Sequence, residues 1–157
     1  MSEARGPAVD AQTIEEVNRS NYPERYRPAV AGRSWRRLGD AFGLSHFGVN
    51  LVRLAPGAAS SQRHWHSHED ELVYVLAGTP TLITDAGEQQ LAPGMVVGFK
   101  AGAADGHHLV NRTAQDTLFL AIGDRVERDE CVYPDIDLLL KLVDDQPRYT
   151  HKDGTPY

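Results

Sequence analysis

Residues 63–78 read RHWHSHEDELVYVLAG, and this stretch decides how the rest of the chain is interpreted. His64, His66 and His68 occupy every second position, three acidic residues follow directly, and an apolar run then ends at Gly78. Side chains two residues apart on a β-strand point to the same face. His64 and His66 are therefore predicted to form a chelating pair on one face of a strand.

Glu71 has the opposite parity from these histidines, so a straight strand would turn it away from them. We expect the polar segment SHED (67–70) to form a turn that resets the parity. Glu71 then begins the strand ELVYVLAG, on the face that it shares with Val73 and Val75. A carboxylate at the head of an apolar strand face needs a partner, because an unpaired buried charge is costly. A divalent cation would supply that partner.

The second histidine cluster is DGHHLVN, residues 105–111. On a strand, His107 and Asn111 share one face and His108 takes the other, so only one of the two histidines can join the first cluster. The spacing alone leaves open which of them does. The result would be a site of three imidazoles and one carboxylate, with one or two positions left for water or substrate. Nitrogen-rich ligation of this kind suits first-row transition metals.

The rest of the chain shows strand signals at short intervals. Runs of β-branched, aromatic and alternating apolar residues begin near Arg33, and turns rich in Gly, Pro, Asn and Asp separate them. One such turn, at Asp85-Ala86-Gly87, indicates a hairpin. Strands do not alternate with helices, so a β-sandwich or barrel is predicted. The segment IDLLLKLVDD (136–145) fits either a helix or an extended segment.

Three segments are expected along the 157 residues. Residues 1–32 are polar, contain several prolines, and are interpreted as an arm packed on the domain surface. Residues 33–134 would form the β-barrel domain. Residues 135–157 would be a short C-terminal extension that packs against a neighbouring segment or another subunit.

Composition is that of a soluble globular protein, with 41% apolar and 24% charged residues. The net charge of −6 argues against nucleic acid and against a membrane surface as partners. No apolar run reaches the roughly 18 residues of a membrane span, and the first thirty residues lack the apolar centre of a secretory signal. Cys131 is the only cysteine, which favours a reducing compartment, so a cytoplasmic protein is expected.

The motifs now described resemble those of the cupin superfamily. The first cupin motif consists of a glycine, an HxH pair, a glutamate and a second glycine at set intervals. Its counterparts here are Gly57, His64-Trp65-His66, Glu71 and Gly78, with a first spacer that is one residue longer. This motif is specific, because it combines two kinds of metal ligand with two turn glycines.

The second cupin motif is matched more loosely. Lys100 stands where the family pattern has proline, and the loop after Gly102 is two residues longer than in the pattern. The interval to Asn111 nevertheless matches His107 to the histidine of the motif. The resemblance therefore favours His107 over His108 as the fourth ligand.

The resemblance implies an all-β fold, the double-stranded β-helix or jelly-roll barrel, with ligands inside its mouth. It implies one divalent transition metal, Fe, Mn, Ni, Co or Zn. The metal ligands would be His64, His66, Glu71 and His107. The end of the chain is similar to an uncharacterised branch of bacterial single-domain cupins, sometimes given the provisional name sugar phosphate isomerase. Cupins of this type commonly pair through their sheets, so a homodimer is expected.

Two classes of function follow as expectations. The first is a metal-dependent enzyme acting on a small molecule, either an iron dioxygenase or an isomerase in which Zn or Mn acts as a Lewis acid. The second is a non-catalytic module that binds or senses a small molecule. Isomerisation needs a base, for which His68, Glu69 and His108 are candidates by proximity. Lys100 is a candidate for holding a phosphate or carboxylate group of the substrate.

Overall fold

The computed structural model describes residues 7–157, and its regular structure consists of strands and single 3-10 turns. The largest sheet has, in order of neighbours, β1 (Glu16–Val17), β2 (Arg33–Arg37), β3 (Phe47–Leu54), β10 (Thr117–Asp124), β5 (Glu71–Ala77) and β8 (Val96–Phe99). A second sheet has β7 (Gly87–Gln90), β6 (Thr81–Thr84) and β9 (His108–Val110). A third has β13 (Gln146–Thr150), β12 (Leu138–Val143), β11 (Glu130–Tyr133) and β4 (Trp65–His66).

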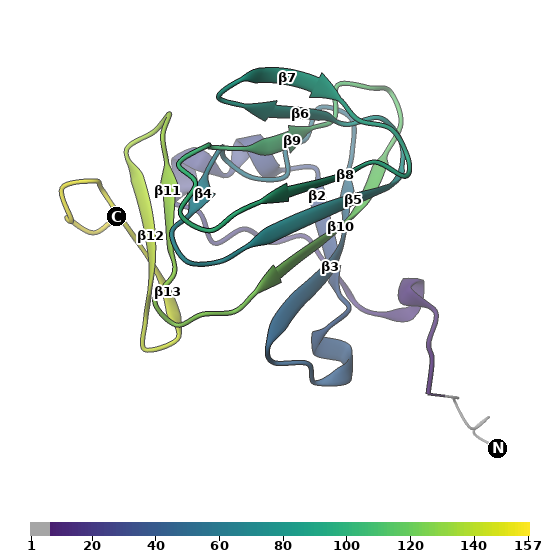
Figure 1. The fold of residues 1–157 in the computed structure, drawn as a ribbon, viewed down its shortest axis with the longest axis horizontal. Coiled ribbons are helices and arrows are strands. Elements are labelled where there is room, and N and C mark those ends of the chain that lie inside the picture. The colour runs from purple at the N-terminus through teal and green to yellow at the C-terminus, as the bar shows by residue number, and fades with distance from the viewer. Residues whose placement is uncertain (1–6) are drawn as a thin grey trace.

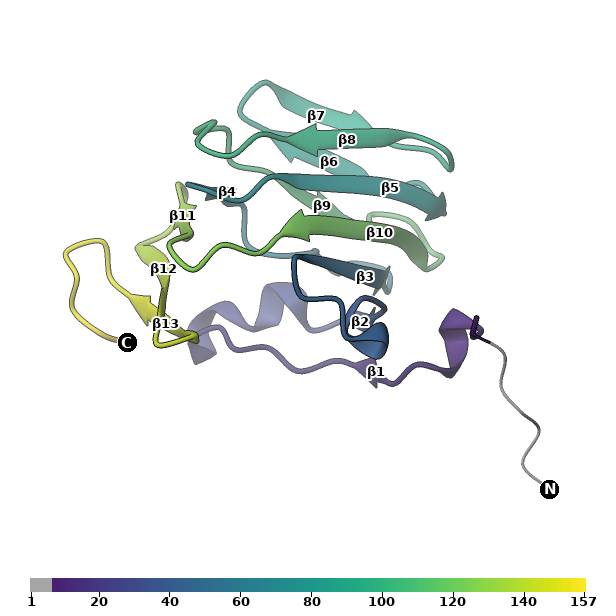
Figure 2. The same ribbon diagram turned by 60° about the horizontal axis from the view of Figure 1, so that its bottom comes forward.

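The first two sheets face each other and the third lies across one end, at the left of Figure 1. Every strand pairing within residues 7–157 is antiparallel. Figure 2 shows the strands of the two facing sheets stacked one above another, with the third sheet beside them. The predicted all-β jelly-roll architecture is confirmed.

Strand β5 shows how the sequence sets the inside and the outside of the barrel. Val73 and Val75 are buried, whereas Leu72 and Tyr74 are exposed on the outer face. Alternation of this kind is expected where one face of a strand meets a core. The predicted inward face of residues 71–77 is therefore confirmed.

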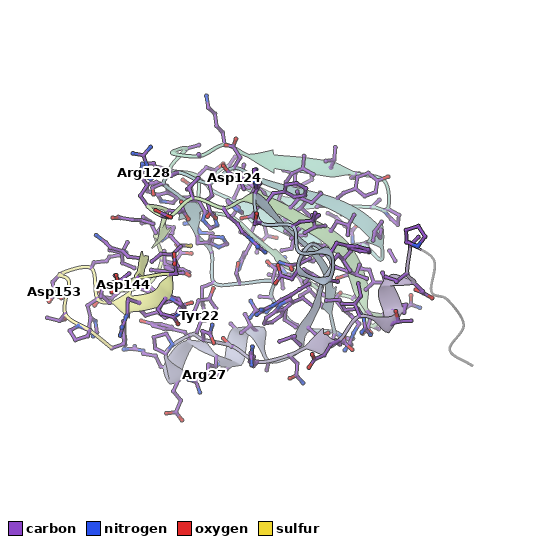
Figure 3. All side chains as sticks on the ribbon, turned by 90° about the horizontal axis from the view of Figure 1, so that it is seen from below. Tyr22, Arg27, Asp124, Arg128, Asp144 and Asp153 are labelled. Carbon is purple, nitrogen blue, oxygen red and sulfur yellow. The ribbon has the colours of Figure 1, made fainter. Side chains whose placement is uncertain are left out.

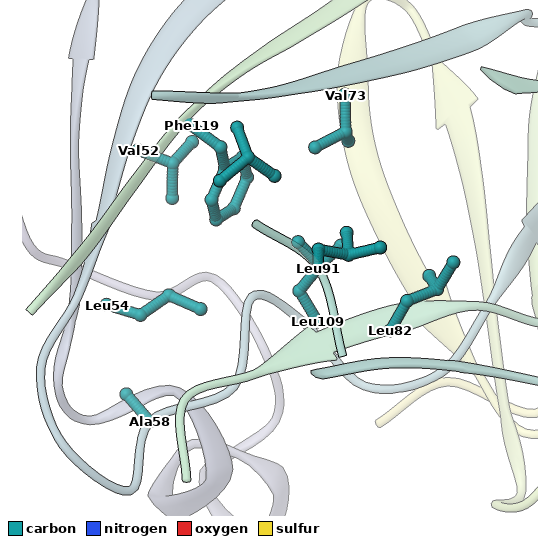
Figure 4. Packing of buried hydrophobic residues seen from close by; sticks show 9 residues of the cluster. Val52, Leu54, Ala58, Val73, Leu82, Leu91, Leu109 and Phe119 are labelled. Atoms are coloured by element: carbon teal, nitrogen blue, oxygen red, sulfur yellow. The ribbon is translucent and has the colours of Figure 1, made fainter. Parts of the chain in front are cut away.

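An apolar cluster fills the space between the facing sheets (Figure 4). Its buried members are Val52, Leu54, Ala58, Val73, Val75, Leu82, Leu91, Leu109 and Phe119. The cluster joins β3, β5 and β10 on one side to β6 and β9 on the other. Because apolar burial is the main favourable term in folding, this cluster holds the two sheets together.

Glycine is required where β5 ends. Gly78 has φ +77°, which L side chains rarely adopt, and a Cβ there would lie 2.7 Å from the Thr117 side chain. This close approach seats the end of β5 against the start of β10. The predicted hairpin at Asp85-Ala86-Gly87 is also present, as the turn between β6 and β7.

The segment 136–145, which fitted both helix and strand, contains β12. This strand is paired on one side with β11 and on the other with β13. The chain then turns at Asp144 and Asp145, both with positive φ, to form the C-terminal hairpin. Pairing on both edges satisfies the backbone groups of β12, so tertiary context decides what periodicity left open.

The predicted arm is described over residues 7–32, which contact the large sheet and the C-terminal hairpin, while residues 1–6 lie outside the described range. Strand β1 extends the large sheet by pairing with β2. Tyr22 lies beside the C-terminal hairpin (Figure 3), with its ring centroid 5.7 Å from that of Tyr149. The arm, strand β11 and the C-terminal extension together form a second buried cluster, made of Tyr22, Tyr26, Val30, Cys131, Tyr133 and Leu138. No helical segment within residues 7–157 has the length and hydropathy needed to cross a bilayer.

Candidate metal centre

The four predicted ligands are brought together by strand pairing. His64 and His107 form an antiparallel bridge with two backbone hydrogen bonds, of 3.2 and 2.8 Å. His66 follows on β4, and Glu71 is the first residue of β5. Residues 67–70 leave the strand between them, as the parity argument required. Segments about forty residues apart in sequence thereby meet at one end of the barrel.

A single carboxylate oxygen marks the centre of the cluster. Glu71 Oε2 lies 3.2 Å from His66 Nε2, 3.6 Å from His107 Nε2 and 3.7 Å from His64 Nε2. The donor atoms of His64, Glu71 and His107 all lie within 4.8 Å of one another. All three imidazoles therefore turn the same ring nitrogen, Nε2, toward one point.

The other ring nitrogen of each histidine is held by a protein oxygen. The acceptors are the Gln62 carbonyl for His64 (2.9 Å), the Asp129 carboxylate for His66 (2.7 Å) and the Asp105 carbonyl for His107 (3.1 Å). Carbonyl and carboxylate oxygens accept hydrogen bonds, so Nδ1 carries the proton in each ring. Nε2 is thereby the nitrogen through which each ring would bind a metal ion, and His66 would lose its Nε2 proton on binding.

The donor set fits a transition metal ion. His107 Nε2 is buried and has no hydrogen-bond partner among residues 7–157, although buried polar atoms are normally satisfied. A metal ion bound at this point would supply the partner that His107 Nε2 lacks. Three imidazole nitrogens and one carboxylate oxygen are ligands that suit Fe, Mn, Ni, Co or Zn.

The arrangement of the cluster also shifts the pKa values of its own ionisable groups. Burial alone would raise the pKa of Glu71, but the three imidazoles that face its carboxylate hold it well below its usual range. Burial opposes protonation of His66, yet hydrogen bonds to Asp129 and Glu71 raise the pKa of His66 to about 10. Each shift arises because groups of opposite charge lie close together where water reaches them poorly: the imidazoles around Glu71, and the carboxylates of Asp129 and Glu71 beside His66.

Asp129 supports the site from behind His66. It is buried, and its second carboxylate oxygen accepts backbone N–H groups of His68 (2.9 Å) and Glu69 (3.1 Å). Asp129 thus orients a ligand and fixes the turn between two ligands. No spacing rule indicates it, because Asp129 and His66 are 63 residues apart.

Arg63 ties three loops at the rim of the site. Its guanidinium donates two hydrogen bonds of 2.7 Å to Asp135, one of 2.9 Å to the Gly106 carbonyl, and one to Asp85. Arg63 and Gly106 immediately precede the ligands His64 and His107. A Cβ at Gly106 would lie 2.7 Å from Pro134, so the loop has no room for a side chain.

Cys131, which was not predicted at the site, lies close to it. Its Sγ is within 4.8 Å of donor atoms of His64 and His66. Burial strongly raises the pKa of the Cys131 thiol. The thiolate is the metal-binding form of cysteine, so the protonated Cys131 is a poor competitor for the ion.

A cavity of about 220 Å³ opens beside the ligands. It is lined by Glu71, His64 and His107, by Arg33, Trp35, Asn50, Ser60, Ser61 and His108, and by Val52, Val73, Leu109, Phe119 and Ala121. The cavity therefore joins the predicted metal ligands to the apolar core.

The predicted base candidates lie in different places. Only His108 lines the cavity; its Nδ1 donates to the Ser61 carbonyl at 2.8 Å, and burial lowers the pKa of His108. His68 is exposed. Glu69 accepts a hydrogen bond from the Val126 backbone, and it does not line the cavity.

Lys100, the predicted substrate-binding residue, lies apart from the cavity. It lines a separate depression on the outer side of the sheet, with Asp70, Leu72 and Asp124 among its neighbours. Its predicted contact with substrate stays a prediction.

Comparison with known proteins agrees with this description. The Cupin domain family matches residues 50–123. A crystal structure from Silicibacter pomeroyi, named as a sugar phosphate isomerase from a cupin superfamily, is 46% identical, covers 96% of each chain and superposes with a TM-score of 0.92. A search of curated proteins found no significant match.

Two further structures extend the comparison. One, from Acidithiobacillus ferrooxidans, provisionally named a sugar phosphate isomerase, is 32% identical with a TM-score of 0.73, and the match covers 81% of this chain and 82% of that one. The polyketide cyclase RemF from Streptomyces resistomycificus is 21% identical with a TM-score of 0.62, and the match covers 76% of this chain and 80% of that one. At that identity the last match speaks for the fold alone.

Proposed function

The chain belongs to the cupin superfamily, and on this premise we propose that it is a metal-dependent enzyme that isomerises a small hydroxy-carbonyl compound of the sugar phosphate type. The observation that carries the proposal is the convergence of three Nε2 atoms on one oxygen of Glu71, with the Nδ1 of each ring held by a protein oxygen. The name of the Silicibacter pomeroyi relative supports the choice of reaction.

The metal ion would be held by His64, His66, Glu71 and His107. It would be one of Fe, Mn, Ni, Co or Zn, and as a Lewis acid it would polarise the carbonyl oxygen of the substrate. The substrate would bind in the adjoining cavity, whose lining includes the apolar side chains of Val73 and Phe119.

Isomerisation of a hydroxy-carbonyl compound requires that a proton leave the hydroxyl-bearing carbon beside the carbonyl and be delivered to the former carbonyl carbon, while the hydroxyl proton passes to the former carbonyl oxygen. The carbon-to-carbon transfer is the step that needs a base. We assign this transfer to His108. Its Nδ1 is engaged by Ser61, so its Nε2 is the free acceptor, and it lines the same cavity as the metal ligands. Glu71 is unsuited to the task, since its oxygen is committed to the ligand cluster.

The test begins with metal content. Purified protein should hold about one transition-metal ion per chain, and His64→Ala or Glu71→Gln should lose it while His68→Ala, an exposed neighbour, keeps it. Mn- or Zn-loaded protein is then assayed for aldose–ketose interconversion of pentose and hexose phosphates. His108→Gln should lower kcat by about 10²–10⁴-fold with metal content unchanged.

Two other outcomes would replace this proposal. Oxygen uptake by Fe(II)-loaded protein, in the absence of isomerisation, would favour a dioxygenase. Tight binding of a small molecule without turnover under any metal would favour a sensing module. Full metal content in the Glu71→Gln variant would contradict the ligand set itself.

We also propose a homodimer in a cytoplasmic setting. The outer face of the large sheet exposes Leu72, Tyr74 and Leu76 of β5 beside Val96 of β8, an arrangement that a second copy of the sheet would cover. The single buried cysteine suits a reducing compartment. Sedimentation at micromolar concentration should show a mass of twice 17.3 kDa, and a monomer alone would refute the dimer.

A further inference from the structure

We propose that Arg33 binds an anionic group of the substrate, so that the ligand of this cavity is a small oxyanion-bearing molecule held between the metal ion and one guanidinium. The inference rests on the proposed function and deepens it, because it names the residue that selects the substrate class. Nothing in the sequence motifs points to this residue.

Strand register turns Arg33 toward the barrel interior. Arg33 on β2 pairs with Leu54 on β3, and Trp35 pairs with Val52. Residues directly opposite each other on antiparallel strands share a face, and Leu54 and Val52 belong to the apolar cluster. Arg33 thus occupies an inward position, and it lines the same cavity as the metal ligands.

Among the arginines of residues 7–157 that have no carboxylate partner, Arg33 is the only one that is not exposed. Within residues 7–157, no Asp or Glu oxygen lies within 4.0 Å of its guanidinium. Arg63, Arg112 and Arg125 each contact at least one carboxylate. Nη1 of Arg33 donates to the Ser60 carbonyl at 2.8 Å, while its Nε is buried without a hydrogen-bond partner.

The surroundings of Arg33 make the absence of a carboxylate partner unusual. Its guanidinium lies over the Trp35 ring, 4.7 Å from the centroid. Burying a charge without a partner of opposite sign is costly. An oxyanion in the cavity would remove that cost, because the guanidinium edge that includes Nε can grip a carboxylate or a phosphate with two parallel hydrogen bonds.

The charge around the cavity favours an anion as well. In the part of the chain that the structure describes, Glu71 is the only carboxylate that lines it, and that carboxylate is a proposed metal ligand. A bound divalent cation and Arg33 would leave the cavity with net positive charge. Its volume of about 220 Å³ corresponds to roughly seven waters at ~30 Å³ each, which limits the ligand to a small metabolite.

A phosphate and a carboxylate share the chemistry that Arg33 recognises, and matched probes separate them. D-Glucose 6-phosphate, D-glucuronate and D-glucose differ only in the group at one end of the same sugar. Inorganic phosphate and acetate test each oxyanion without the sugar. Titration calorimetry on the Mn-loaded full chain measures the affinity for all five.

We expect at least one oxyanion probe to bind, and more tightly than D-glucose. Arg33→Gln should weaken that binding by about 10- to 100-fold, the range for a charge-assisted hydrogen bond. Arg33→Lys should recover part of it, since lysine keeps the charge without the paired donors. Arg37→Gln, an exposed arginine on the same strand, should bind as the parent protein does.

Metal content separates this inference from the proposed function. Arg33→Gln should retain its metal, and Glu71→Gln should lose it. Equal affinity of parent and Arg33→Gln for every oxyanion probe would overturn the assignment, as would tighter binding of D-glucose than of both charged sugars. Failure of all four oxyanion probes to bind the parent protein at millimolar concentration would overturn it too.

Discussion

The interior of the barrel has two ends that are built by the same strands and behave differently. At the apolar end, Val75, Leu82 and Leu91 fill the space between the sheets. At the ligand end, Glu71 and the histidines occupy equivalent inward positions. Glu71 and Val75 lie on one face of one strand, about 13 Å apart at ~3.3 Å per residue. Strand alternation therefore decides only which side chains point inward.

The difference lies in what keeps each end in place. Apolar side chains need close neighbours and nothing more. Each imidazole at the ligand end also needs a protein oxygen that accepts a hydrogen bond from its Nδ1 and so holds the ring in place. Asp129, which accepts from His66, is the clearest case. The apolar end should therefore govern the stability of the fold, and the ligand end should govern metal binding with a smaller effect on stability.

The largest expected effect is at the apolar end. Leu82→Ala removes a buried side chain that does not line the cavity, and should lower the free energy of unfolding by about 2–5 kcal/mol. Leu142→Ala, at an exposed position of β12, should change it by about 0.5 kcal/mol or less. Urea denaturation of metal-free protein measures both, and equal losses would show that the core is not where stability resides.

Metal binding should come next in size. An ion that binds only the folded state, at a hundredfold excess over its Kd, stabilises it by about 2.7 kcal/mol. The parent protein and Leu82→Ala should gain this amount alike, and Glu71→Gln should gain nothing. Thermal unfolding with Mn²⁺ and with chelator makes the comparison. A smaller gain for Leu82→Ala than for the parent would mean that the two ends are energetically coupled.

Loss of the carboxylate behind His66 should have a moderate effect. Asp129→Asn should weaken metal affinity by about 10- to 100-fold, which is the usual consequence of losing a group that orients a metal-binding histidine. Asp124→Asn, whose carboxylate accepts only from the Asp70 backbone at 2.7 Å, serves as the control. Competition with a chromogenic chelator measures the affinity, and unchanged affinity in Asp129→Asn would remove Asp129 from the site.

The smallest effect is expected for the third histidine of the opening stretch. His68 is exposed and contacts the Ser67 hydroxyl at 2.7 Å. His68→Ala should alter unfolding free energy by about 0.5 kcal/mol or less and leave metal content unchanged. A loss of metal in this variant would mean that the ligand end reaches further along the turn than the geometry indicates.

Local patterns predicted the features that depend on neighbours in sequence. Alternation placed Val73 and Val75 inside, and the Asp-Gly turn between β6 and β7 follows from the backbone preferences of its residues. The parity reset before Glu71 was also readable, because a polar segment interrupts the strand. These features require no knowledge of which strands pair.

Features set by strand pairing were beyond the reach of the sequence. Asp129 reaches His66 only because β11 pairs with β4, and Arg33 faces the cavity only because β2 pairs with β3. Segment 136–145 stayed ambiguous for the same reason, since its partners on both sides decide its form. Lys100 was selected because it ends the strand MVVGFK near the expected mouth of the barrel, whereas the structure places it in a separate depression that Leu72 and Asp124 also line.

Arg63 has a consequence for how an ion would be captured. By fastening the loops that precede His64 and His107, it fixes the separation of these two ligands while the chain folds. The conformational entropy of ordering them is then lost before any ion arrives, so metal binding meets a preorganised site. A weaker connection between these two loops should make metal binding slower and weaker, although every donor atom would remain. Ions whose size does not match the spacing of His64 and His107 would benefit least from the preorganised site.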